Sequence, residues 1–147
     1  MTIGEQLAED LKKAMKRHDD LTKDVIRLMR AALQNATIEK GEDLSEQDSE
    51  GVPARMAKQH RDSITIYRDA GRTDLVTKEE AELKVVMRYL PEQLGAADVM
   101  ALARAIAEEV GAAGPGDKGK VMGKLMPQLK GKADGTMVNT VVGEMLD

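Results

Sequence analysis

The chain has 147 residues, a formal net charge of −4, no cysteine, no Phe, no Trp and two tyrosines. The absence of cysteine excludes disulfides and thiolate metal sites, and the length suits one compact domain or two small ones. Ten methionines supply adaptable apolar bulk. Because sheets favour aromatic and β-branched residues, this composition predicts an all-α protein.

The first predicted helix begins at Thr2 and Glu5, which have the spacing of a capping box. A second helix is predicted from about Leu21 to Lys40, with Gly41 as its C-cap. The two helices would form a hairpin. The inward positions expected on the second helix are Val25, Ile26, Leu28, Met29, Ala32, Leu33 and Ala36.

The acidic segment 42–50 is weakly patterned, and we expect a loop there. Proline is tolerated in the first turn of a helix, so a third helix is predicted from Pro53 to Ala70. Thr77 begins another sequence with capping-box spacing. The fourth helix therefore starts there or near Thr73.

The character of the sequence changes at Pro91, after which charge falls and Ala and Gly become more frequent. Apolar residues at helical spacing predict three helices: 96–110, one capped by Asp117, and one over 138–146. The predicted fold is therefore all-α, with an N-terminal helical domain over 1–92 and a small three-helix domain over 93–147. The N-terminal domain consists of the hairpin and two further helices.

Motifs of catalysis are missing from the sequence. The adjacent carboxylates at 19–20, 79–80 and 108–109 do not face one another on a helix, so we expect caps or solvated surface pairs. His18 and His60 have no partner by spacing. The phosphate-loop, nucleophile-elbow and zinc-protease motifs are absent. We therefore predict no catalytic residue, no metal ligand and no cofactor.

Lysines gather in a short C-terminal stretch whose counter-charge is Asp117. Glycines lie between them and would let a phosphate backbone approach the main chain, which suits contacts without base readout. A solvated lysine surface that serves solubility is the alternative. The residues concerned are Lys118, Gly119, Lys120, Gly123, Lys124, Lys130, Gly131 and Lys132.

A second basic stripe follows helical spacing on the third predicted helix, diluted by Asp62 and Asp69. Surface ion pairs commonly decorate helices, and we expect them here rather than a nucleic-acid contact. The stripe consists of Lys58, Arg61, Arg68 and Arg72.

Several segments, in order along nearly the whole chain, resemble the GatB/YqeY family. One departure is Lys118, where relatives are expected to carry an apolar residue. The segments that carry the resemblance are Val25–Met29, Arg72–Val76, Tyr89–Leu94, Asp117–Pro127, Lys130–Gly135 and Val138–Asn139.

The resemblance implies two all-α domains, the second similar to the tail of the GatB subunit of tRNA-dependent amidotransferase. That enzyme converts Glu-tRNA(Gln) to Gln-tRNA(Gln), or Asp-tRNA(Asn) to Asn-tRNA(Asn). Its tail helps hold tRNA, whereas the kinase and transamidation chemistry lies in a separate core. This chain is too short for that core and lacks residues that would cradle ATP and Mg²⁺. The family name could therefore carry over the label of a carbon–nitrogen ligase with glutamine as amido-N-donor. We do not expect that activity of this chain.

The leading hypothesis is a non-catalytic tRNA-binding or tRNA-associated accessory module. The five lysines would contact phosphates, and the near-absence of aromatic residues removes the stacking platforms of single-stranded RNA binding. We therefore expect weak, salt-sensitive contacts to the backbone.

Two alternatives stay open. The chain could be a helical adaptor that docks on an amidotransferase or another tRNA enzyme, or it could act as a ligase with a donated active site. No apolar run approaches the roughly 20 residues of a membrane span, and the first residues are polar and acidic rather than signal-like. We expect a cytoplasmic protein without a membrane partner.

Overall fold

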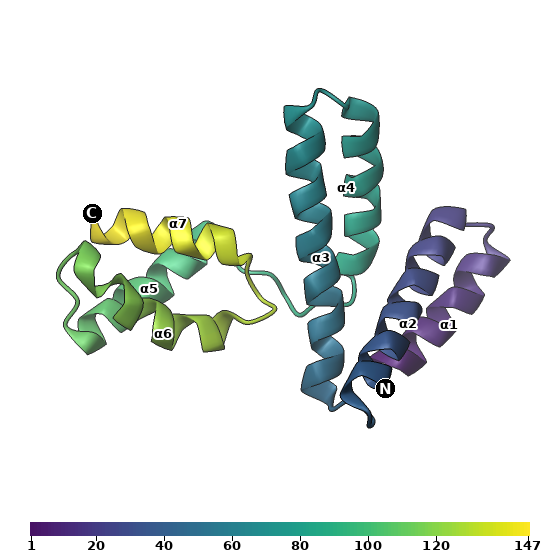
Figure 1. Ribbon diagram of the computed structural model, residues 1–147, viewed down its shortest axis with the longest axis horizontal. Coiled ribbons are helices and arrows are strands. Elements are labelled where there is room, and N and C mark those ends of the chain that lie inside the picture. The colour runs from purple at the N-terminus through teal and green to yellow at the C-terminus, as the bar shows by residue number, and fades with distance from the viewer. The chain divides into compact units, whose positions relative to one another are not determined.

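The computed structural model describes residues 1–147 and is all-α, as predicted (Figure 1). By contact the chain divides into two compact units, Met1–Leu90 and Pro91–Asp147, and each is described by itself. The predicted domains, 1–92 and 93–147, differ from these units by two residues at the boundary. No helix combines the length and the apolar character needed to cross a bilayer. The elements are α1 (Ile3–Lys16), α2 (Asp20–Lys40), α3 (Glu46–Asp69), α4 (Thr73–Met87), α5 (Ala96–Val110), the 3₁₀ turn η1 (Pro115–Asp117), α6 (Lys118–Leu129) and α7 (Gly135–Leu146).

Side-chain caps define the first hairpin, α1 and α2. The Oγ1 of Thr2 accepts a hydrogen bond from the backbone N–H of Glu5 at 3.2 Å, and Asp19 caps α2 by accepting from the N–H of Thr22 at 3.1 Å. Gly41 ends α2 in the left-handed conformation with φ 77°, as its C-cap position requires. The predicted start and end of this hairpin are therefore confirmed to within one residue.

Helix α3 begins at Glu46, well before the predicted start at Pro53. Ser45 caps it, because its Oγ accepts from the N–H of Asp48 at 3.1 Å. Proline inside a helix removes one backbone hydrogen bond, and the burial of Pro53 and its neighbour Val52 offsets that loss. The loop predicted for 42–50 is therefore wrong over its second half.

Helix α4 begins at Thr73, directly after Arg72. Thr77 lies inside the helix, where its hydroxyl donates to the carbonyl of Thr73 at 3.0 Å, so the capping box predicted at Thr77 is wrong.

Leu28 was predicted to face inward, but its side chain is 57% exposed. Helices α3 and α4 pack side by side as a second hairpin (Figure 1). The core of this unit contains Leu7, Leu11, Val25, Ile26, Met29, Ala57, Val85 and Val86.

In the second unit, α5, α6 and α7 surround one apolar core. Helix α5 has the bounds that the sequence predicted, and Gly111 ends it with φ 68°. Asp117 directly precedes α6, but it does not cap it with its side chain. Its Oδ2 accepts instead from the N–H of Ala113 at 2.9 Å, which closes the loop before α6. The core consists of Val99, Ala103, Ile106, Val121, Leu125, Leu129, Val138, Val141, Val142 and Leu146.

Candidate functional site

The lysine-rich surface begins on the exposed side of α6. Val121, Leu125 and Leu129 recur on one side of this helix and are buried in the core. Lys120 and Lys124 are four residues apart and therefore lie together on one side of the helix, which is turned away from the core, and both are exposed.

These two lysines have acidic neighbours within their own unit. The Nζ of Lys120 lies 3.5 Å from Oδ1 of Asp117, and the Nζ of Lys124 lies 2.8 Å from Oε1 of Glu109. The hydrogen bond from the backbone of Ala113 lowers the pKa of Asp117, and Lys120 lowers it further. Exposed ion pairs contribute little and are screened by salt, so both lysines can exchange a carboxylate for another anion.

Lys118 lies on a different side of α6 from Lys120 and Lys124. It stands seven residues before Leu125 and therefore shares the inward side of α6. Its Nζ lies 3.4 Å from the position that a Cβ on Gly143 would occupy, which places the ammonium against α7. The structure thus separates Lys118 from the set that the sequence grouped together.

Lys130 and Lys132 flank a turn that is held by the segment entering the unit. The side-chain amide of Gln93 donates to the carbonyl of Gly131 at 2.8 Å, and the N–H of Leu94 donates to the carbonyl of Lys132 at 2.8 Å. Gly131 has φ 76°, a conformation that L residues with a side chain rarely adopt. Both lysines are exposed and neither forms an ion pair in the structure. We call Lys130–Lys132 the lysine turn.

Glycines on the exposed side of α6 are not required by internal packing. A Cβ on Gly119 or Gly123 would meet no atom within 4 Å. Glycine inside a helix is destabilising relative to alanine by roughly 0.5–1 kcal/mol. The absence of side chains at these two positions therefore leaves open backbone beside Lys120 and Lys124.

Three of the four residues of the second basic stripe form the predicted surface ion pairs, and Arg72 lies just before α4 rather than on α3. The stripe's pairs are Lys58 with Asp62 at 3.2 Å, Arg68 with Glu80 at 3.5 Å and Arg72 with Asp74 at 3.1 Å. Hydrogen bonding from the Arg72 guanidinium lowers the pKa of Asp74. Arg61 donates instead to the sulfur of Met87 at 3.3 Å. This stripe offers little unbalanced charge to a nucleic acid.

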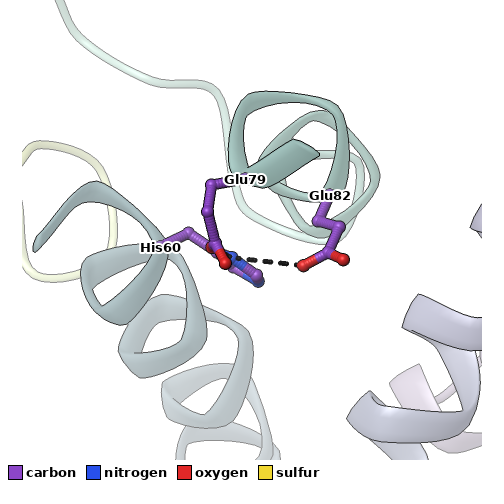
Figure 2. Close-up of side chains that lie close together, drawn as sticks. All are labelled: His60, Glu79 and Glu82. Carbon is purple, nitrogen blue, oxygen red and sulfur yellow. Dashed lines mark hydrogen bonds and ion pairs between the residues drawn. The ribbon is translucent and has the colours of Figure 1, made fainter. Parts of the chain in front are cut away.

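A second polar cluster lies between α3 and α4, where sequence reasoning expected no partner for His60 (Figure 2). The Nδ1 of His60 lies 2.6 Å from Oε2 of Glu79 and 3.8 Å from Oε2 of Glu82. These three side chains are 14%, 18% and 16% exposed, respectively. We call them the His60 cluster.

The structure corrects two expectations at this cluster. His60 has a partner, and Glu79 is a half-buried member of the cluster rather than a cap or a solvated surface residue. The neighbouring Glu80 is exposed and pairs with Arg68, as expected of a surface carboxylate. One feature of the sequence pointed to this cluster. Glu79 and Glu82 are three residues apart, which places their carboxylates one turn apart on one side of a helix.

Comparison with known proteins identifies one matching family and several similar yeast proteins. The sequence model of a family described as "Yqey-like protein" matches residues 4–146. The chain is also similar to the proteins named "Altered inheritance of mitochondria protein 41, mitochondrial" of three yeasts. Identity is 38% over 85 residues for Lachancea thermotolerans and 40% over 85 residues for Vanderwaltozyma polyspora. It is 34% over 87 residues for Saccharomyces cerevisiae.

These alignments cover 57–58% of the chain and 46–47% of the yeast proteins, so the chain spans less than half the length of these relatives. The names of these yeast proteins describe them as mitochondrial. The expectation of a cytoplasmic protein, which rested on the polar first residues, is therefore wrong. An unremarkable N-terminal composition was too weak a basis for assigning a compartment.

Proposed function

The chain belongs to the YqeY-like protein family, and from this premise we propose that its C-terminal unit, Pro91–Asp147, is a non-catalytic module that binds the phosphate backbone of tRNA. The observation that carries the proposal is the lysine turn. It presents two exposed ammonium groups without acidic partners on a backbone fixed by hydrogen bonds. Fixing that backbone before binding reduces the conformational entropy that ordering it would cost.

The exposed side of α6 extends the proposed interface. Lys120 and Lys124 can each release a solvent-exposed carboxylate in favour of a phosphate, at small cost. Gly119 and Gly123 leave the backbone beside them uncovered. Lys118 lies against α7 and contributes to the charge of the unit rather than to this side of α6.

The chemistry of the unit favours backbone contact over base recognition. Both tyrosines of the chain, Tyr67 and Tyr89, lie in the first unit, so residues 91–147 contain no aromatic ring on which a base could stack. Contacts made by lysine to phosphate carry no sequence information. Binding should therefore be of modest affinity and should weaken steeply as salt concentration rises.

The experiment measures tRNA binding by the purified full chain across a potassium chloride series. We compare wild type with two double variants, Lys130→Ala/Lys132→Ala and Lys120→Ala/Lys124→Ala. Each lost phosphate contact should make the plot of log affinity against log salt shallower by about 0.7–0.9, so each double variant should lose about 1.4–1.8 in slope. The matched control is Lys12→Ala/Lys16→Ala, which removes two exposed lysines of α1 in the first unit.

The proposal is supported if the lysine-turn variant binds more weakly with a shallower slope and the α1 control matches wild type. Equal binding by wild type and both C-terminal variants would contradict it, as would an equal loss in the control. A parallel assay of amide transfer from glutamine to misacylated tRNA should give no product with the purified chain alone, and turnover would overturn the non-catalytic assignment.

A second candidate function is protein docking through α2. Leu21 and Leu28 stand seven residues apart and therefore share one side of the helix. Their side chains are 40% and 57% exposed, respectively, although large apolar residues are usually buried. A partner protein retained after nuclease treatment, and lost with Leu28→Ser but not with Lys130→Ala/Lys132→Ala, would favour docking over RNA binding.

A further inference from the structure

The His60 cluster brings three metal-ligating side chains together from two helices. Glu79 and Glu82 lie on one side of α4, and His60 faces them from α3 (Figure 2). The three ligating atoms, Nδ1 of the histidine and one oxygen of each carboxylate, all lie within 4.8 Å of one another. The hairpin packing of α3 against α4 holds the two sides at this distance.

A histidine–carboxylate hydrogen bond explains only part of this arrangement. The contact of 2.6 Å between Nδ1 of His60 and Oε2 of Glu79 is a complete interaction for one donor and one acceptor. Glu82 then adds a second carboxylate 3.8 Å from the same nitrogen, beyond hydrogen-bond distance. Its own charge finds no other ion-pair partner in the structure.

Basic side chains of α3 do not neutralise the negative charge of Glu79 and Glu82. Lys58 pairs with Asp62, Arg68 pairs with Glu80, and Arg61 donates to a methionine sulfur. Two carboxylates therefore share one imidazole at positions that are mostly removed from solvent. Partly buried charge of one sign is unfavourable unless it is paired or coordinates a metal, so a cation between the three side chains would relieve this excess.

We propose that the His60 cluster binds a divalent transition-metal ion, with Zn²⁺ as the preferred probe. One imidazole nitrogen and two carboxylate oxygens form a donor set that Zn²⁺ accepts, with bonds of about 2.0–2.2 Å. Tetrahedral geometry at these bond lengths places donors about 3.3 Å apart. The observed separations of 2.6 and 3.8 Å from Nδ1 lie on either side of that value, and all three ligating atoms lie within 4.8 Å of one another, so side-chain movements on the order of 1 Å would complete the site.

Metal binding has a defined proton balance here. Metal binding at Nδ1 requires the hydrogen on that nitrogen to leave: a neutral imidazole takes it up again on Nε2 through solvent, whereas an imidazolium releases it to solvent and keeps the hydrogen of Nε2. Both carboxylates bind in their ionised form, one oxygen each. Three protein ligands leave the fourth position of a tetrahedral ion to water, the arrangement of open zinc sites.

The test titrates Zn²⁺ into the chelator-treated full chain by isothermal calorimetry. Wild type should bind about one equivalent. Glu82→Gln keeps the hydrogen bond between His60 and Glu79, so the helices remain joined, yet it removes one ionised ligand and should lower affinity by at least about tenfold. Glu80→Gln is the matched control, because it removes a carboxylate of α4 that pairs with Arg68 outside the cluster.

Thermal unfolding with and without Zn²⁺ provides a second readout, since an ion that binds the folded state raises the melting temperature. The rise should occur in wild type and in Glu80→Gln, and it should be much smaller in Glu82→Gln. His18→Ala should leave both readouts unchanged, which separates this site from binding at the other histidine. Absence of stoichiometric Zn²⁺ binding by wild type, or an equal loss in Glu80→Gln and Glu82→Gln, would overturn the proposal.

Discussion

Gln93 and Gly131 are joined across 38 residues of sequence, because the side-chain amide of Gln93 donates a hydrogen bond of 2.8 Å to the carbonyl of Gly131. The same amide nitrogen also donates to the carbonyl of Pro91 at 2.8 Å. One side chain thus connects the segment that enters the second unit with the lysine turn. The turn is therefore positioned by a residue outside the lysine-rich sequence.

Replacing Gln93 tests this connection directly. Gln93→Ala removes two hydrogen bonds, each with a net contribution of about 0.5–1.5 kcal/mol, so the free energy of unfolding should fall by about 1–3 kcal/mol. Affinity for tRNA should fall as well, while the salt slope stays near the wild-type value, because no lysine is lost. Urea unfolding and the tRNA salt series measure the two effects. Gln128→Ala is the control, since its amide makes only an exposed contact of 3.5 Å, and an equal effect there would contradict the prediction.

Gly123 allows stability and binding to be separated. A Cβ at this position meets no atom within 4 Å, so Gly123→Ala should raise the free energy of unfolding by roughly 0.5–1 kcal/mol. If a phosphate approaches this stretch of backbone, the same variant should bind tRNA more weakly. Gly51→Ala in α3, where a Cβ would also meet nothing within 4 Å, should stabilise the chain without changing binding. Stronger tRNA binding by Gly123→Ala would count against the proposed interface on α6.

Tyr89 should ionise only at unusually high pH. Burial, and then the hydrogen bond of 2.6 Å from its hydroxyl to Oδ2 of Asp10, raise the pKa of Tyr89 well above its ordinary value of about 10. The unfolded chain loses this proton first, so stability is full below about pH 10 and decreases as the pH rises toward the folded-state pKa.

The near-ultraviolet absorbance of Tyr67→Phe reports Tyr89 alone, because the chain has two tyrosines and no tryptophan. Its titration midpoint should lie above about 10 in the native chain and near that value in urea. Adding Asp10→Asn should lower the native midpoint. A native midpoint at the ordinary value would show that the hydroxyl is neither desolvated nor held by Asp10.

The capping interaction of Asp19 should be lost in acid, and the folded state should lose stability with it. The hydroxyl of Thr22 donates to Asp19 at 2.7 Å and the backbone N–H of Thr22 donates at 3.1 Å, and these bonds lower the pKa of Asp19. The stabilisation is present above the unfolded-state pKa of about 3.9 and is lost as the pH falls through the lower, folded-state value.

Asp19→Asn should therefore lower the urea midpoint at neutral pH, and its difference from wild type should shrink below about pH 4. The control is Asp24→Asn, which changes an exposed carboxylate of the same helix that forms no ion pair in the structure. A difference between Asp19→Asn and wild type that is constant with pH would contradict the role of the ionised cap.

The sequence was sufficient to predict the bounds of a helix where the helix has both a regular apolar pattern and a glycine at its end. Helix α5 could be predicted to the residue because its buried positions recur regularly and Gly111 can adopt the left-handed conformation. The start of α3 was missed because Pro53 carried a stronger signal than the cap at Ser45. Burial of Val52 and Pro53, which permits a proline inside the helix, depends on packing that no local pattern reports.

For the two candidate sites too, the sequence predicted what depends on spacing within one helix and missed what depends on packing between helices. Grouping by sequence placed five lysines together, whereas the helical period turns Lys118 toward α7 and leaves Lys120 and Lys124 on the exposed side. His60 and Glu79 lie 19 residues apart, and their contact depends on the relative register of α3 and α4. Spacing within either helix does not determine that register, so the cluster could not be predicted.

Pro53 also interrupts the hydrogen-bond ladder of α3, and we expect the parts of the helix before and after it to open separately. With no N–H at this position, the hydrogen-bond ladder of the helix has a gap between its first turns and the part that contains His60. Unwinding that starts at the end capped by Ser45 can therefore stop at the proline, and amides of residues 46–52 should exchange with solvent faster than those of residues 57–69. The gap shields the His60 cluster from fraying of the helix end, so the pairing of α3 with α4 can persist while the first turns of α3 open and close.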